Sequence, residues 1–212
     1  MKLYNFSLAP NGLRVLAFLK EKKIKLDTHE VNVRDGEQFK EPFKSMNSFN
    51  CIPFLELDDG TIITESVSIC RYLEEEYYPN PPLFGNSPKQ RAQIDMWNRR
   101  LELDCLTPLG HALRNKISFF SDRVLAGTRN NIKQSNDIVE RGIEMSNLLF
   151  DRIEPHLEKN KFICGDEFSV ADITGHSIFI NFERLKLEVP SKFKNVIKWK
   201  SRLYEKDCFK NE

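Results

Sequence analysis

The residues with the clearest chemical potential lie in one stretch, from Asn50 to Ser66, which reads NCIPFLELDDGTIITES. An apolar strand begins directly after Pro53, although proline removes a hydrogen-bond donor and weakens a sheet. We therefore predict a cis peptide bond between Ile52 and Pro53, in a turn built for it. Such a bond turns the Ile52 backbone out of the sheet, so that its free N–H and C=O can pair with an extended peptide.

The same stretch ends in Glu65 and Ser66, where a helical pattern begins. The N-terminus of a helix offers unpaired N–H groups and a positive dipole end, which attract a carboxylate. Ser66 adds a hydroxyl, and Glu65 can hold an ammonium group. The two ends of the stretch together predict a site for the head of an amino acid whose peptide lies along Ile52. Taken singly, Ile52-Pro53 is also an ordinary turn and Glu65-Ser66 an ordinary helix cap.

Residues 1–78 contain the elements that must position this stretch. The pattern predicts a strand over 2–6, a helix that starts near Pro10, and a second strand in KLDTHEVNV. This unit implies a parallel strand pair with a right-handed crossover. A polar, weakly helical stretch follows, then an antiparallel hairpin with an Asp-Gly turn. A helix from Ser66 to Tyr77 completes the order β-α-β-α-β-β-α.

The second half of the chain is predicted to be all-helical. Residues 79–87 fall in the proline-rich stretch YPNPPLFGNSP and have the composition of a linker. From residue 88 to residue 212 the apolar residues recur at helical spacing and no strand pattern is evident. Ser169 and Asp172 form the sequence of a capping box, which we assign to folding rather than to function.

Composition excludes several classes of function. The net charge is +1, with 32 basic and 31 acidic residues, so there is no basic excess to neutralise nucleic-acid phosphates. No segment approaches the ~20 apolar residues of a membrane span, and the N-terminus lacks the pattern of a signal peptide. The five cysteines are widely spaced without C-x-x-C, which fits neither a disulfide framework nor a zinc site. We expect a cytoplasmic protein without a metal that acts on a small molecule or a protein partner.

The strand-helix half with CIPFLELDDGTIITES, the proline linker and the helical half with FSVADI together resemble a cytosolic glutathione transferase over nearly the whole chain. The resemblance implies a thioredoxin-like N-terminal domain, an all-α domain that supplies the wall for a hydrophobic electrophile, and a homodimer. It implies that Ile52-Pro53 binds the cysteinyl part of glutathione and Glu65-Ser66 the γ-glutamyl part. Glutathione is then a co-substrate, and no further cofactor is expected.

The glycyl end of glutathione has a less regular pattern. Family members often carry Gln, Lys or Arg two residues before the proline, where this chain has Cys51. Gln38 aligns with a frequent His or Gln in the same role. Cys51 is either a packing thiol or a residue that forms a mixed disulfide with glutathione.

The residue that activates the glutathione thiol is the feature that departs most from the family pattern. Many members place a Tyr, Ser or Cys near the start of the first helix, whereas this chain reads FSLAPNGLRV. Ser7 and Asn11 are the candidates, and the pattern resembles yeast and bacterial transferases that use the helix N-terminus instead. In those enzymes Ser and His residues of the helical domain hold a water. The matching region here carries Thr107, His111 and Asn115, which share one helix face.

Three functions remain open at this point. The leading hypothesis is a transferase that conjugates the glutathione thiolate to small hydrophobic electrophiles. A binding protein of the same fold, without turnover, is favoured by the missing Tyr, Ser or Cys. A glutathione-dependent isomerase is the third, although its usual Ser-Ser-Cys stretch is absent from LAPNGLR.

Overall fold

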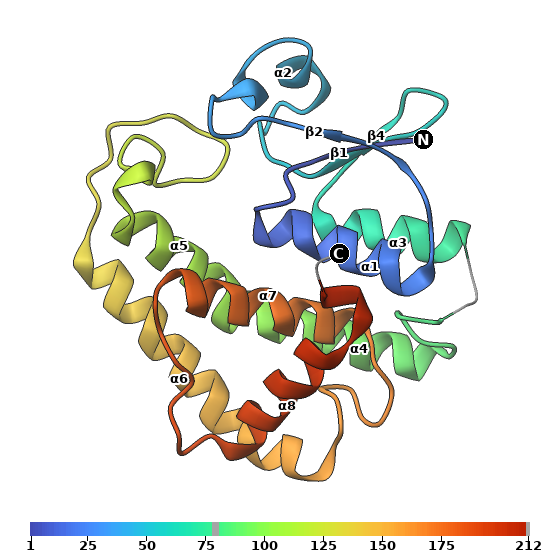
Figure 1. Cartoon of the computed structure of the whole chain (residues 1–212), viewed down its shortest axis with the longest axis vertical. Helices are drawn as coiled ribbons and strands as arrows, with labels where there is room; N and C mark the ends of the chain where they lie inside the picture. Colours follow the sequence, from blue (N-terminus) through green and yellow to red (C-terminus); the bar gives the residue numbers. More distant parts are fainter. Residues whose placement is uncertain (78–80, 211–212) are drawn as a thin grey trace. The chain divides into compact units, whose positions relative to one another are not determined.

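The computed structural model describes residues 1–77 and 81–210, which divide into two compact units (Figure 1). The first unit comprises Met1–Pro81 together with Ala126–Thr128, and the second comprises Pro82–Leu125 and Arg129–Glu212. The predicted linker over 79–87 begins outside the described residues, at 79 and 80, and the predicted helical domain ends outside them, at 211 and 212.

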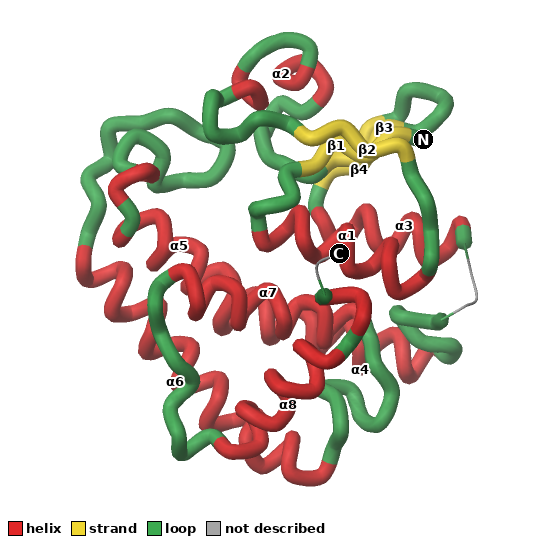
Figure 2. The backbone as a smooth tube through the Cα atoms, viewed as in Figure 1, coloured by secondary structure: helices red, strands yellow, loops and turns green. Residues whose placement is uncertain are grey.

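The first unit is built on a four-stranded mixed sheet in the order β2-β1-β3-β4. Its strands are drawn in yellow in Figure 2. The β-α-β-α-β-β-α order predicted from the sequence is confirmed, with one additional 3-10 turn, η1, after β2. The elements are β1 (Lys2–Asn5), α1 (Pro10–Lys22), β2 (Asp27–Glu30), η1 (Glu37–Phe39), α2 (Phe43–Met46), β3 (Phe54–Glu56), β4 (Ile62–Thr64) and α3 (Ser66–Glu76).

Strand β1 organises this sheet, because it pairs in parallel with β2 and antiparallel with β3. Successive side chains of a strand point to opposite faces. Leu3 is fully buried in the unit, and α1 and α3 pack against each other. Tyr4 lies in the aromatic packing with Phe43 and Phe54, and its ring stacks on Phe54 at 4.6 Å between centroids. Apolar packing thus holds the two central strands, β1 and β3, where Leu3, Phe54 and Leu55 are fully buried.

The second unit is helical, as predicted. Its elements are α4 (Pro88–Leu101), the π-helix η2 (Glu102–Leu106), α5 (Thr107–Lys116), η3 (Ser118–Phe120), α6 (Asn136–Lys159), α7 (Val170–Arg184), α8 (Lys194–Glu205) and η4 (Asp207–Phe209). Elements α4, η2 and α5 follow one another without a break. The π-helix has a local cause in Pro108, which has no N–H to donate to the preceding turn. The N–H of Thr107 instead reaches back to the carbonyl of Glu102.

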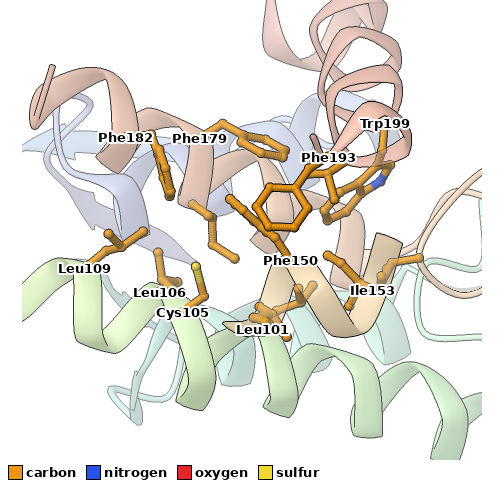
Figure 3. Close-up of a cluster of buried hydrophobic side chains, with 14 of the residues drawn as sticks. Leu101, Cys105, Leu106, Leu109, Phe150, Ile153, Phe179, Phe182, Phe193 and Trp199 are labelled. Carbon is orange, nitrogen blue, oxygen red and sulfur yellow. The ribbon is translucent and has the colours of Figure 1, made fainter. Parts of the chain in front are cut away.

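The core of the helical unit is aromatic at its centre (Figure 3). Phe150 from α6 lies close to Phe179 and Phe182 from α7 and to Phe193, which precedes α8. Trp199 from α8 packs edge-on against Phe179 at 5.5 Å between ring centroids. Each of these rings is at most 2% exposed, so the central helix α7 is held by apolar packing along most of its length.

The predicted capping box forms at the start of α7. Asp172 accepts hydrogen bonds from the Ser169 N–H and hydroxyl, and it also accepts from the Ile163 N–H and the Trp199 indole N–H. Complete burial raises the pKa of Asp172 to about 6, although all four hydrogen bonds favour the carboxylate. A local helix-start motif therefore also anchors α8 and the loop before α7.

Candidate active site

The carboxyl-terminal end of β1 meets the start of β3 and the end of β4 at one edge of the sheet. Tyr4 pairs with Phe54, and Phe54 pairs with Thr64. Continued by one residue, this register brings Pro53 between Asn5 and Glu65. The Ile52–Pro53 bond is cis, which confirms the prediction. The two ends of the NCIPFLELDDGTIITES stretch are therefore neighbours in space.

The start of α3 has the geometry of an anion site. Glu65 has φ 67° and ψ 123°, a positive φ that is unusual for a residue with a side chain. The first intrahelical bond runs from the Ile69 N–H to the Glu65 carbonyl. The N–H groups of Ser66, Val67 and Ser68 have no partner one turn earlier and are the donors that a bound carboxylate needs. A strained residue at such a position is typical of a functional site.

Arg14 of α1 fixes the hydroxyl of Ser66. Its Nη1 donates to Ser66 Oγ at 3.0 Å, and both side chains are buried. Because Ser66 Oγ accepts this bond, its own proton remains available for a ligand. Arg14 is a site residue that the sequence motifs do not point to. Its signal was present, since Arg14, Phe18 and Lys22 recur at a spacing of four on the buried face of α1.

The start of α1 presents a second set of helix donors. Pro10 occupies the first helical position and Asn11 follows it, so the N–H groups of Asn11 and Gly12 have no partner one turn earlier. Gly12 permits this close approach to the end of β1, because a Cβ there would lie 2.2 Å from the carbonyl oxygen of Phe6. The two helix starts and Arg14 bring positive charge to this edge, and Glu30 and Glu65 bring carboxylates to it.

Ser7 lies beside the start of α1, but its hydroxyl is engaged. Ser7 Oγ and the Ser7 N–H both donate to Glu30 Oε1 at 2.8 Å. Glu30 ends β2 and could not have been paired with Ser7 from the sequence alone. Asn11 is exposed. Of the two predicted thiol-activating residues, only Asn11 therefore has a donor that is not directed at a carboxylate of this chain, and both assignments remain predictions.

The two residues proposed for the glycyl end also belong to the first unit. Gln38 lies in η1 and is 6% exposed, and its Oε1 makes no hydrogen bond to any described residue. Cys51 is half-buried, directly before Ile52. None of the five cysteines, all of which lie in the described part of the chain, forms a disulfide. Burial raises the pKa of the Cys70 and Cys105 thiols to about 12, so neither is a reactive thiolate at neutral pH.

The three residues proposed for the electrophile site lie in the second unit, on α5. Thr107 and His111 are exposed, whereas Asn115 is half-buried. The Asn115 amide donates to the His111 carbonyl at 2.8 Å and its oxygen accepts from the Ser135 N–H at 2.9 Å. Asn115 thus holds the connection between α5 and α6, whereas the side chains of Thr107 and His111 are presented to solvent.

Among residues 1–77 and 81–210 no group of three or more His, Cys, Asp or Glu side chains is placed to hold a metal ion. Within the same residues, no helix has both the length and the apolar character needed to cross a bilayer. The site combines two helix starts, the buried guanidinium of Arg14 and the Glu65 carboxylate. These groups surround the Ile52 backbone, which can pair with an extended peptide.

Family models match both halves of the chain. Residues 9–76 match the glutathione S-transferase N-terminal domain, and residues 118–207 match the glutathione S-transferase C-terminal domain. Glutathione S-transferase D7 of Drosophila melanogaster is 32% identical over 94% of this chain and 82% of that protein. Glutathione S-transferase 2 of Saccharomyces cerevisiae is 29% identical over 99% of this chain and 88% of its own length.

Solved structures agree with these relatives. Gtt2 from Saccharomyces cerevisiae superposes with a TM-score of 0.88 at 27% identity, covering 99% of this chain and 98% of that one. A Gtt2-class glutathione S-transferase of Vibrio parahaemolyticus gives a TM-score of 0.83 at 32% identity, covering 100% and 96%. The chain belongs to the glutathione S-transferase family, and within it resembles members from yeast and bacteria. It is a glutathione transferase.

Proposed function

We propose that this transferase joins the sulfur of glutathione to small hydrophobic electrophiles, with the first unit binding glutathione. The observation that carries the proposal is the adjacency of Pro53 and Glu65, together with the bond from Arg14 to Ser66. The γ-glutamyl carboxylate would lie at the start of α3, against the Ser66 hydroxyl and N–H. Its ammonium group would lie on Glu65, and the cysteinyl backbone would pair with Ile52.

In this arrangement the thiol lies toward the start of α1. The N–H groups there and the Asn11 amide would stabilise the thiolate and lower the pKa of the glutathione thiol from its free value of ~8.5. The thiol proton passes to solvent. The thiolate sulfur then attacks an activated carbon of the electrophile, and where a halide is the leaving group it departs with the bonding pair. Proximity of the two reactants supplies the remaining acceleration.

A binding protein without turnover is the second candidate. The observation in its favour is that the Ser7 hydroxyl donates to Glu30, which leaves the thiol to be activated by helix donors and an amide. A protein that binds glutathione with the affinity of a transferase but leaves it protonated would fit this arrangement.

One experiment separates these functions. The purified chain is incubated with glutathione and 1-chloro-2,4-dinitrobenzene, with peroxide reduction measured in parallel and glutathione binding measured by calorimetry. We expect binding and conjugation together. Binding without turnover of either substrate would favour the second candidate, and the absence of binding would contradict the whole proposal.

The setting of this activity is also part of the proposal. We infer that the protein acts in the cytoplasm as a homodimer and that its role is the detoxification of electrophiles. Five cysteines without a disulfide among them support a reducing compartment. The family to which the chain belongs supports the dimer.

A further inference from the structure

The loop 47–51, which leads into Ile52, is held by hydrogen bonds of its own residue Asn47. This side chain is 3% exposed, and its Nδ2 donates to the Cys51 carbonyl at 2.7 Å. Its Oδ1 accepts from the Phe49 N–H at 3.1 Å, and its carbonyl accepts from the Asn50 N–H at 2.8 Å. One buried amide therefore fixes both the turn at 47–50 and the carbonyl of the residue before Ile52.

The same loop also contacts a segment that is distant in sequence. Ala126–Thr128 belongs to the first unit, although it lies between α5 and α6 in sequence. The Asn50 Nδ2 donates to the Gly127 carbonyl at 3.2 Å. A Cβ on Gly127 would stand 1.9 Å from the Phe49 carbonyl oxygen and 3.0 Å from Cys51 Sγ. Backbone therefore rests directly on backbone here, and a residue larger than glycine would displace the loop.

The loop carries an exposed aromatic ring. Phe49 is 71% exposed, so its ring adds little to the stability of the turn that carries it. Asn50 has φ 50°, a conformation that Asn tolerates better than most residues. The hydrogen bonds of Asn47 and Asn50 and the contact with Gly127 therefore contribute to the position of the loop.

We propose that Gly127, with Asn50 and Asn47, is a positioning device for glutathione binding. Cys51 is covalently joined to Ile52, so a shift of the loop moves the N–H and C=O on which the cysteinyl backbone pairs. The inference rests on the proposed glutathione site. It adds that a segment between two helices of the other half of the sequence sets the geometry of that site, and that none of these three residues needs to touch the thiol.

The test compares alanine substitutions at two glycines that both have a positive φ. Gly127 and Gly60 both have positive φ, +68° and +84°, but a Cβ on Gly60 meets nothing within 4 Å. Gly127→Ala carries both backbone strain and the collision with Phe49, whereas Gly60→Ala carries the strain alone. The isosteric Asn50→Asp variant keeps the tolerance for positive φ and removes the donor to Gly127 without changing any glycine.

Two readouts are measured for each variant. Amide hydrogen exchange of the peptide covering 47–55 reports on the loop without any ligand. The KM for glutathione, separated from kcat and checked by calorimetry, reports on the site. We expect faster exchange in Gly127→Ala and Asn50→Asp, and a KM raised about three- to tenfold, the factor for one lost neutral hydrogen bond. The kcat should stay within about twofold, and Gly60→Ala should match the wild type in both readouts.

Unchanged exchange over 47–55 in Gly127→Ala and Asn50→Asp would overturn the positioning device, and so would an equal rise of KM in Gly60→Ala. Faster exchange with an unchanged KM would overturn its role in glutathione binding. If the wild-type chain bound no glutathione in calorimetry, the proposed function would fall, and this positioning role with it. The exchange data would then still show whether Gly127 holds the loop.

Discussion

Arg14 and Ser66, separated by 52 residues in sequence, are joined by a 3.0 Å hydrogen bond from Nη1 to Oγ. The bond links the second turn of α1 to the first residue of α3, so it ties together the two helices whose starts lie at the candidate site. Because the guanidinium is a donor only, it fixes Ser66 as an acceptor on one side and as a donor on the other. A buried cation thereby orients the hydroxyl that we assign to the γ-glutamyl carboxylate.

Removal of that hydroxyl should weaken glutathione binding. We expect Ser66→Ala to cost about 1–3 kcal/mol of binding free energy, the range for a hydrogen bond to a charged group. Ser68→Ala is the matched control, since Ser68 is exposed in the same turn of α3. Calorimetry measures both. An unchanged affinity in Ser66→Ala would place the γ-glutamyl carboxylate elsewhere.

Thiol activation should depend on Asn11 more than on Ser7. The Ser7 hydroxyl donates to Glu30, so Ser7→Ala should keep most activity. Asn11→Ala should lower kcat/KM by roughly ten- to a hundredfold, the worth of one hydrogen bond to an anion. His111→Ala should lose some activity through disturbed water or substrate placement. The measurement is kcat/KM against pH. If Ser7→Ala alone abolished turnover and raised the apparent thiol pKa, the serine would be the activating residue.

His176 should make the protein less stable in acid. Its ring is 7% exposed and stacks on Phe209 at 3.8 Å between centroids. Burial lowers its pKa from 6.5 to about 4; Glu183 opposes this shift and Lys200 adds to it. The unfolded chain therefore binds the proton first. The stability that the neutral His176 contributes to the folded state is fully present above pH 6.5. It is lost as the pH falls toward 4, which lowers the free energy of unfolding by about 3 kcal/mol in all.

The test for His176 is a difference measurement. His176→Phe keeps a ring against Phe209 and removes the titrating group. The free energy of unfolding of both proteins is measured by urea titration from pH 7 to pH 4. The wild type should lose stability relative to the variant over this range. The raised pKa of Asp172 changes stability with pH in the opposite direction. Because Asp172 is present in both proteins, its effect cancels in the difference. A constant difference would show that His176 has an ordinary pKa.

Two helical glycines should respond oppositely to alanine. A Cβ on Gly175 would lie 2.3 Å from the Trp199 ring, inside the core of the helical unit. Gly175→Ala should destabilise the protein by about 1–3 kcal/mol through overpacking. A Cβ on Gly110 meets nothing within 4 Å, so Gly110→Ala should stabilise by about 0.5–1 kcal/mol. Chemical denaturation measures both, and the same sign for the two variants would contradict the packing described for α7 and α8.

The oligomeric state has a direct test. One chain has a mass of 24.8 kDa. Sedimentation velocity should show a species of twice this mass at micromolar concentration. A single species at the mass of one chain, unchanged by added glutathione, would refute the homodimer.

Much of the molecule could be predicted from local patterns. The β-α-β-α-β-β-α order, the cis Ile52–Pro53 bond, the helix start at Ser66 and the Ser169–Asp172 capping box are confirmed. Each is set by residues a few positions apart, through side-chain periodicity, proline geometry or helix-end hydrogen bonding. These interactions lie within short segments, so sequence alone contains the information that decides them.

Other features were decided only when distant segments packed together. Ser66 accepts a hydrogen bond from Arg14, and Asp172 accepts one from Trp199. The Gly127 backbone lies directly against the Phe49 carbonyl. The partners in these pairs are between 27 and 78 residues apart. No local periodicity encodes such pairs, because they depend on strand register, helix packing and the path of a long connection. The sequence by itself determined the elements and the position of the glutathione motif, and the tertiary structure decided which polar groups hold that motif in place.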